Sequence, residues 1–224
     1  MSDDSFIREV DEELRSDRMR QIWTQYGRII IGVAVAIVLV TVGYQFYLSY
    51  RAGEAAEAGD AFLNAVELAE AGKTEEAEKA LSEIIANSTP AYQGLAQLRL
   101  AAEKAVAGDH QAAIAAYDAV AANSVLEKSY RDMANLRAAI ILVDHGSLED
   151  VIKRAEPLAS PSGIFRFSAQ EALGLASYKA KKLEDAAKWF TAIANDASAP
   201  TTMRGRADLM LSVIASVGGP KKES

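Results

Sequence analysis

Gly72-Lys73-Thr74-Glu75-Glu76-Ala77 is the first of four similar segments that set the fold of this chain. The other three read Gly108-Asp109-His110-Gln111-Ala112-Ala113, Gly146-Ser147-Leu148-Glu149-Asp150-Val151 and Lys181-Lys182-Leu183-Glu184-Asp185-Ala186. Their starts lie 36, 38 and 35 residues apart. Each segment has the composition of a short turn that ends one helix and begins another, so the pattern predicts a stack of about four helical pairs.

Small residues recur at fixed distances from these turns. Seven residues before the four turns stand Ala65, Ala101, Ala139 and Gly174, and the segments themselves end in Ala77, Ala113, Val151 and Ala186. Larger packing positions follow at Leu81, Tyr117, Ala155 and Phe190. Small residues let paired helices approach closely, and a period near 34 residues is typical of tetratricopeptide repeats. The sequence therefore predicts an all-α tetratricopeptide-type α-solenoid.

Turn and cap chemistry predicts the helix boundaries. We expect left-handed glycines in the turns at Gly72, Gly108 and Gly146, and helix caps at Thr74 and Ser147. Ser124 with Glu127 resembles a capping box. Proline is expected to open helices at Pro90 and Pro200 and to end the second helix of the third repeat at Pro157. Residues 201–217 are expected to form a terminal capping helix.

Residues 29–50 form the longest apolar run, twenty-two residues without a charge between Arg28 and Arg51. As a helix it would reach ~33 Å, enough to cross the ~30 Å hydrocarbon layer. Aromatic residues stand at both ends, as at membrane interfaces: Trp23, Tyr26, Tyr44, Phe46, Tyr47 and Tyr50. A buried core helix and a cleaved signal peptide are the alternatives, but the run is long for either.

Charge beside this run predicts the orientation. The first 28 residues carry five arginines, whereas the twenty residues after Tyr50 carry only Arg51. Positive residues stay on the cytoplasmic side, so we expect a single-pass protein with a cytoplasmic N-terminus. The expected parts are a leader over residues 1–28 that forms an amphipathic helix, a transmembrane helix over 29–50, an outer domain over 51–217 and a disordered tail over 218–224.

Composition excludes several functions for the outer part. After Tyr50 there are 19 Lys and Arg against 24 Asp and Glu, so no basic surface for nucleic acid is predicted. The chain has no cysteine and two histidines, His110 and His145, which lack the spacing of metal ligands. No phosphate-binding glycine loop and no nucleophile motif is present. We therefore predict no enzyme activity, no cofactor and no metal site.

The first helices of tetratricopeptide pairs line the binding face of the stack. Counting from the turns places nine apolar residues on that face: Phe62, Val66, Leu95, Leu98, Met133, Leu136, Ile140, Leu175 and Tyr178. An apolar face of this kind favours peptide segments of other proteins. The alternative is that individual members pack against neighbouring repeats.

Nearly the whole chain beyond Tyr26 resembles the YfgM-type ancillary subunits of the bacterial Sec translocon. The resemblance is carried by the order of leader, span and degenerate repeats, and by Tyr92-Gln-Gly94-Leu-Ala-Gln-Leu98-Arg-Leu-Ala101, Asn135-Leu-Arg137, Glu171-Ala-Leu-Gly174 and Asp208-Leu-Met-Leu-Ser-Val-Ile214. It implies a bacterial inner-membrane protein with a periplasmic domain. The partners that it implies are the Sec translocon channel subunits and a membrane-anchored peptidyl-prolyl isomerase chaperone, near exported polypeptides.

Two functions are compatible with these features. The first is a membrane-anchored scaffold that links the translocon to periplasmic chaperones, where anchoring raises the local concentration of partners. The second is a structural organiser of another envelope complex, such as cell division or secretion machinery.

Overall fold

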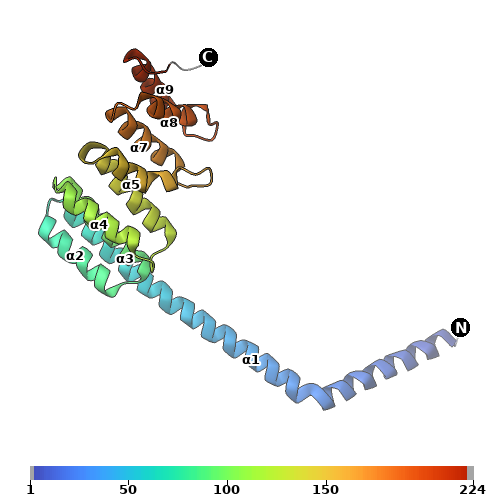
Figure 1. The fold of residues 1–224 in the computed structure, drawn as a ribbon. Coiled ribbons are helices and arrows are strands. Elements are labelled where there is room, and N and C mark those ends of the chain that lie inside the picture. Colours follow the sequence, from blue (N-terminus) through green and yellow to red (C-terminus); the bar gives the residue numbers. More distant parts are fainter. Residues whose placement is uncertain (1–2, 221–224) are drawn as a thin grey trace. The chain divides into compact units, whose positions relative to one another are not determined.

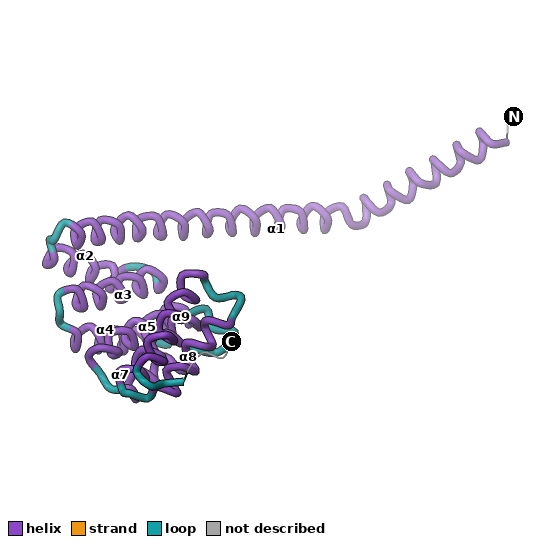
Figure 2. The backbone as a smooth tube through the Cα atoms, turned by 90° about the horizontal axis from the view of Figure 1, so that it is seen from above, coloured by secondary structure: helices purple, strands orange, loops and turns teal. Residues whose placement is uncertain are grey.

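The computed structural model describes the backbone of residues 3–220, and the side chains of residues 20, 23–29 and 31–220. It divides into two compact units, Met1–Ala55 and Ala56–Ser224. Within the described residues all regular structure is helical, and Figure 2 shows helices joined by loops with no strand. The all-α prediction is therefore confirmed.

Helix α1 extends over Asp3–Glu70, so leader and span belong to one helix. In the first unit its apolar side chains, from Ile29 and from Ile31 to Tyr50, are exposed. Gly27, just before this run, is buried because the Trp23 ring covers it, at 3.6 Å from where a Cβ would stand. The side chains on which an amphipathic leader was predicted, those of residues 6–14 and 22, lie outside the described ones.

This helix is the one among the described residues that is long and apolar enough to cross a membrane. A core helix of a soluble protein would bury its apolar side chains against other elements. Here none of the described side chains of the span is buried, and an apolar surface of this size is stable only when lipid or a partner covers it.

The second unit consists of helical pairs in chain order (Figure 1). The end of α1 pairs with α2 (Thr74–Asn87), and α3 (Pro90–Val106) with α4 (His110–Ala122). Next come α5 (Lys128–His145) with α6 (Leu148–Ala155), and α7 (Arg166–Lys179) with α8 (Leu183–Asn195). We call these pairs repeats one to four. Helix α9 (Thr201–Ser216) packs on repeat four, so the predicted four pairs and capping helix are confirmed.

A buried triplet recurs in the second helix of every repeat, and in repeat three its last member lies just after that helix. Its members are Ala77, Leu81 and Ile84; Ala113, Tyr117 and Val120; Val151, Ala155 and Leu158; and Ala186, Phe190 and Ile193. On the first helices Ala65, Ala101 and Ala139 are fully buried, and Gly174 takes the same place. A Cβ at Gly174 would lie 2.8 Å from the Phe190 ring, so glycine is needed for the close approach of α7 and α8. The predicted packing positions are thus confirmed.

The turns follow the prediction only in part. Gly72 and Gly108 have φ of 73° and 82°, but Gly146 has φ of −134° and is extended. In the fourth turn Lys181 adopts the left-handed conformation, with φ of 60°. Extended backbone after α5 suffices because Ser147 then caps α6, so the prediction for Gly146 is wrong.

The caps were also predicted in part. Ser147 and Asp150 form a capping box at the start of α6, as expected for Ser147. Thr74 instead is the first residue of α2, whose N-cap is Lys73 without a side-chain cap. The capping box at Ser124 is wrong, because α5 begins at Lys128 and residues 123–127 form a turn in which Asn123 Oδ1 accepts from the Val125 amide.

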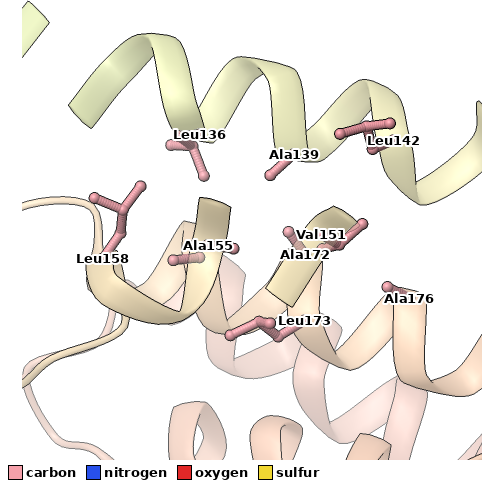
Figure 3. Close-up of a cluster of buried hydrophobic side chains, with 10 residues drawn as sticks. Leu136, Ala139, Leu142, Val151, Ala155, Leu158, Ala172, Leu173 and Ala176 are labelled. Carbon is pink, nitrogen blue, oxygen red and sulfur yellow. The ribbon is translucent and has the colours of Figure 1, made fainter. Parts of the chain in front are cut away.

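Pro157 ends the second helix of repeat three early, as predicted. Helix α6 is followed by the 3-10 helix η1 (Glu156–Leu158) and a loop that reaches α7. Leu158 still closes the buried triplet of this repeat, at 5 % exposure. Figure 3 shows it with Ala155 and Val151 below α5.

Helix α9 opens after Pro200, as predicted, and ends in a hydrogen-bonded turn. Gly218 has φ of 91°, and the Gly219 amide donates to the Ile214 carbonyl at 2.9 Å. The backbone is therefore fixed as far as Gly219, within the tail that was predicted to be disordered. Residues 221–224, the end of that tail, lie outside the described part of the chain.

Candidate functional site

The predicted binding face consists of residues from the first helices of the four repeats. Ile140 on α5 is 45 % exposed, and seven others are half-buried: Phe62, Val66, Leu95, Leu98, Met133, Leu175 and Tyr178. Among these, Phe62, Leu98, Leu175 and Tyr178 also pack against buried clusters at the repeat junctions. Each thus contributes one side to the core and leaves part of its apolar surface accessible.

Leu136 does not belong to this accessible face. It is 4 % exposed and lies in one buried cluster with Ala139 and Leu158, as Figure 3 shows. In this repeat the chain after Pro157 brings Leu158 into the cluster, so Leu136 is covered. The placement of Leu136 on the binding face is therefore wrong, and its role is packing. We call the other eight residues the first-helix face.

Ion pairs connect successive repeats. Arg154 on α6 donates to Asp118 on α4 through Nε at 2.9 Å and Nη2 at 2.7 Å. Arg206 on α9 forms the same bidentate interaction with Glu171 on α7, in which Nε and Nη2 donate to the carboxylate at 2.7 and 2.9 Å. These charge-assisted hydrogen bonds raise the pKa of both arginines and fix the angle between neighbouring elements.

Lys179 makes a third connection between repeats. Its Nζ donates to the carbonyls of Val143 and Asp144, at 3.0 and 2.6 Å, and lies 3.8 Å from the Asp144 carboxylate. The acceptors are the last carbonyls of α5, where a cation also meets the negative end of the helix dipole. Lys179 therefore caps the first helix of repeat three from repeat four.

The two histidines meet, which the sequence analysis missed. The rings of His110 and His145 are stacked, with centroids 3.8 Å apart and planes at 23°. Nδ1 of His110 is buried without a hydrogen-bond partner. Their separation of 35 residues, about one repeat, is the signal that could have predicted the contact. Among the described residues no group of three or more His, Cys, Asp or Glu could hold a metal ion.

A hollow of about 350 Å³ opens beside repeat three. Lys128 and Asp132 of α5 line one side, and Leu158, Ile164 and Phe165 the other. It exists because α6 is short and the following loop is long. Lys128 and Asp132 are joined at 2.5 Å, so the rim carries a neutralised pair rather than a charged group.

The family of this chain follows from its repeated features: the buried triplets, the small residues opposite them and the stacked helical pairs. The model of the tetratricopeptide repeat-like domain matches residues 20–210. The chain belongs to this family. Searches of the curated proteins and of the solved structures found no match.

Membership of the tetratricopeptide repeat-like family has a functional meaning. Such domains are typically non-catalytic modules for protein–protein interaction, and they use extended surfaces built from successive repeats. The match begins at residue 20 and so includes the apolar part of α1 as well as the repeats. Fold and family thus point to an interaction scaffold that carries a helix long and apolar enough to cross a membrane.

Proposed function

We propose that this protein is a membrane-anchored, non-catalytic scaffold that binds other proteins through the first-helix face. The observation that carries the proposal is the combination of two parts in one chain. An apolar span with exposed side chains precedes a stack of repeats that leaves apolar surface accessible on every first helix. A domain held at a membrane meets membrane partners at a high local concentration, so modest affinity suffices.

The more specific proposal is an ancillary subunit of the bacterial Sec translocon. In this role the leader is cytoplasmic, residues 29–50 cross the inner membrane and the repeats lie in the periplasm. The excess of arginine before the span supports this orientation. The partners would be the channel subunits, a membrane-anchored peptidyl-prolyl isomerase chaperone and exported polypeptides, and the resemblance to YfgM-type proteins supports this choice.

Site-specific photocrosslinking in living cells tests the proposal. A photoreactive amino acid at Phe62, Leu98 or Ile140 is expected to capture Sec channel or chaperone subunits. Leu209 is the matched control, because it is an apolar residue on α9 that is 65 % exposed and lies outside the first-helix face. Crosslinks from Leu209 alone, or to no Sec or chaperone subunit from any position, would contradict the proposal.

Localisation separates the Sec role from the organiser of another envelope complex. A fluorescent fusion spread evenly over the membrane is expected for a translocon subunit. A band at the division septum would favour the organiser instead.

A further inference from the structure

The net negative charge of the repeats is confined to repeat one. Residues 56–87 contain eight acids and two lysines, whereas residues 88–217 contain fourteen acids and fourteen basic residues. Within repeat one a single ion pair is formed, between Lys73 and Glu76 at 3.7 Å, and both side chains are mostly exposed. The other acids of this repeat therefore repel one another with little local compensation.

The junction between repeats one and two also lacks a connecting ion pair. Repeats two and three are joined by Arg154, repeats three and four by Lys179, and repeat four and α9 by Arg206. No such pair joins repeats one and two among the described residues. The position equivalent to Lys179, two residues before the turn, is Val106 in repeat two, and the position equivalent to Asp144 is Glu70.

The apolar core of this first junction is small as well. Its buried residues are Ala65, Leu81, Ile84 and Ala96, of which only two have large side chains. Phe62, Ile85, Tyr92 and Leu100 pack against them but are only partly buried. The next junction buries Tyr117, Val120 and Leu126, and the last one Phe190, Ile193, Leu211 and Ile214. In addition α1 ends with Glu67 and Glu70 at the negative end of its dipole, with no basic residue in its last turn.

From these three observations we propose that repeat one opens from repeat two as a cooperative unit while repeats two to four and α9 stay folded. In a stack of repeats each pair contacts only its neighbours, so the weakest junction opens first. Repeat one carries Phe62 and Val66 of the first-helix face. Opening therefore shortens the continuous first-helix face from four repeats to three. This conformational change can admit or release a partner. It does not depend on which partner binds.

Hydrogen exchange measured by mass spectrometry on the full chain in lipid nanodiscs tests the proposal. At low salt the amides of α2 are expected to exchange about tenfold faster than those of α8. Added salt screens the repulsion within repeat one and also weakens the ion pairs of the other junctions. Exchange in α2 should therefore slow by a few-fold between about 20 and 500 mM NaCl, while exchange in α8 stays constant or becomes faster.

A single substitution can supply the missing connection. Val106 is 84 % exposed, so Val106→Lys removes no core contact and places a cation at the position that Lys179 occupies two junctions further along. We expect exchange in α2 to slow about threefold, the size of effect that a surface ion pair gives. Val106→Gln is the uncharged control, and in the Glu70→Gln background the effect of the lysine should be smaller, because only its hydrogen bonds to the last carbonyls of α1 would remain.

Two results would overturn the proposal. One is protection of α2 equal to that of α8 at low salt. The other is the same exchange in α2 for Val106→Lys and Val106→Gln, because that would mean that the junction does not limit opening. Neither result depends on the Sec partners. Hydrogen exchange can therefore refute the opening of repeat one without affecting the proposed Sec role, and crosslinking can refute the Sec role without affecting the opening.

Discussion

Arg154 and Asp118 are joined by two parallel hydrogen bonds although they lie 36 residues apart in sequence. The pair links the second helices of repeats two and three, and the arginine side chain is only 15 % exposed. Because the planar guanidinium fits the carboxylate in one orientation, the pair fixes how the two repeats are rotated against each other. It is the connection that the junction of repeats one and two lacks.

Loss of this pair should destabilise the repeats measurably. Asp118 is 41 % exposed, so water screens the interaction, and we expect Arg154→Gln to lower the free energy of unfolding by about 1 kcal/mol. Urea unfolding of Arg154→Gln, Asp118→Asn and the double variant gives the coupling between the two residues. Lys73→Gln, which breaks the exposed Lys73–Glu76 pair, should cost less. Equal costs for Arg154→Gln and Lys73→Gln would contradict the account.

Gly174 should tolerate no side chain. A Cβ at this position would lie 2.8 Å from the ring of Phe190, which is 1 % exposed and cannot move aside, so Gly174→Ala should cost about 1–3 kcal/mol. Gly205 in α9 has open space around it, and Gly205→Ala should stabilise by about 0.5–1 kcal/mol because alanine favours helix. Thermal unfolding of both variants checks this. Similar effects at both sites would mean that α7 and α8 are not in close contact.

The buried Tyr117 should make the protein sensitive to alkaline pH. Burial raises the pKa of Tyr117, and the nearby positive charge of Arg137 only partly opposes this. A raised folded-state pKa means that the folded protein holds the phenolic proton more tightly than the unfolded chain. Stability is therefore full below the ordinary tyrosine pKa of about 10 and falls as pH rises above it.

Tyr117→Phe removes this group while keeping the ring. Urea unfolding at pH 8 and above pH 10 should show a larger loss of stability for the unmodified protein than for Tyr117→Phe. Lysine deprotonation affects both proteins equally, so it cancels in the comparison. A parallel loss in both would contradict the placement of the hydroxyl in the core.

Leu136 and Ile140 lie on the same helix and should behave in opposite ways. Leu136→Ala removes part of a buried cluster and should cost about 2–5 kcal/mol. Ile140→Ser changes an exposed residue, so stability should change by less than about 0.5 kcal/mol while recovery of membrane partners decreases. Unfolding curves and affinity purification measure the two effects. A stable Leu136→Ala variant would contradict the burial of this side chain.

The repeat positions could be predicted because they depend on residue size at fixed spacing. Small residues stand seven positions before each turn, at Ala65, Ala101, Ala139 and Gly174. A larger side chain there would keep the paired helices apart. Details that depend on three-dimensional context could not be predicted in this way. The extended conformation of Gly146 follows from the capping of α6 by Ser147, and the burial of Leu136 follows from the path of the chain after Pro157.

The contacts between repeats required the structure for a different reason. Contacts such as Arg154–Asp118 and His110–His145 form only when neighbouring helical pairs stack with a particular rotation. The sequence contains their spacing of about one repeat but not that rotation. The predicted binding face is intermediate in this respect, since eight of its nine residues have accessible surface and Leu136 is buried.

Cysteine labelling tests the central claim most directly, that the repeats stand outside a membrane which residues 29–50 cross. The natural chain has no cysteine, so a single cysteine at exposed Ala197, or at Ser5 in the leader, gives a unique label site. In intact spheroplasts a membrane-impermeant maleimide should label Ala197→Cys at once and Ser5→Cys only after lysis. Labelling of Ser5→Cys in intact cells, with Ala197→Cys protected until lysis, would contradict the account.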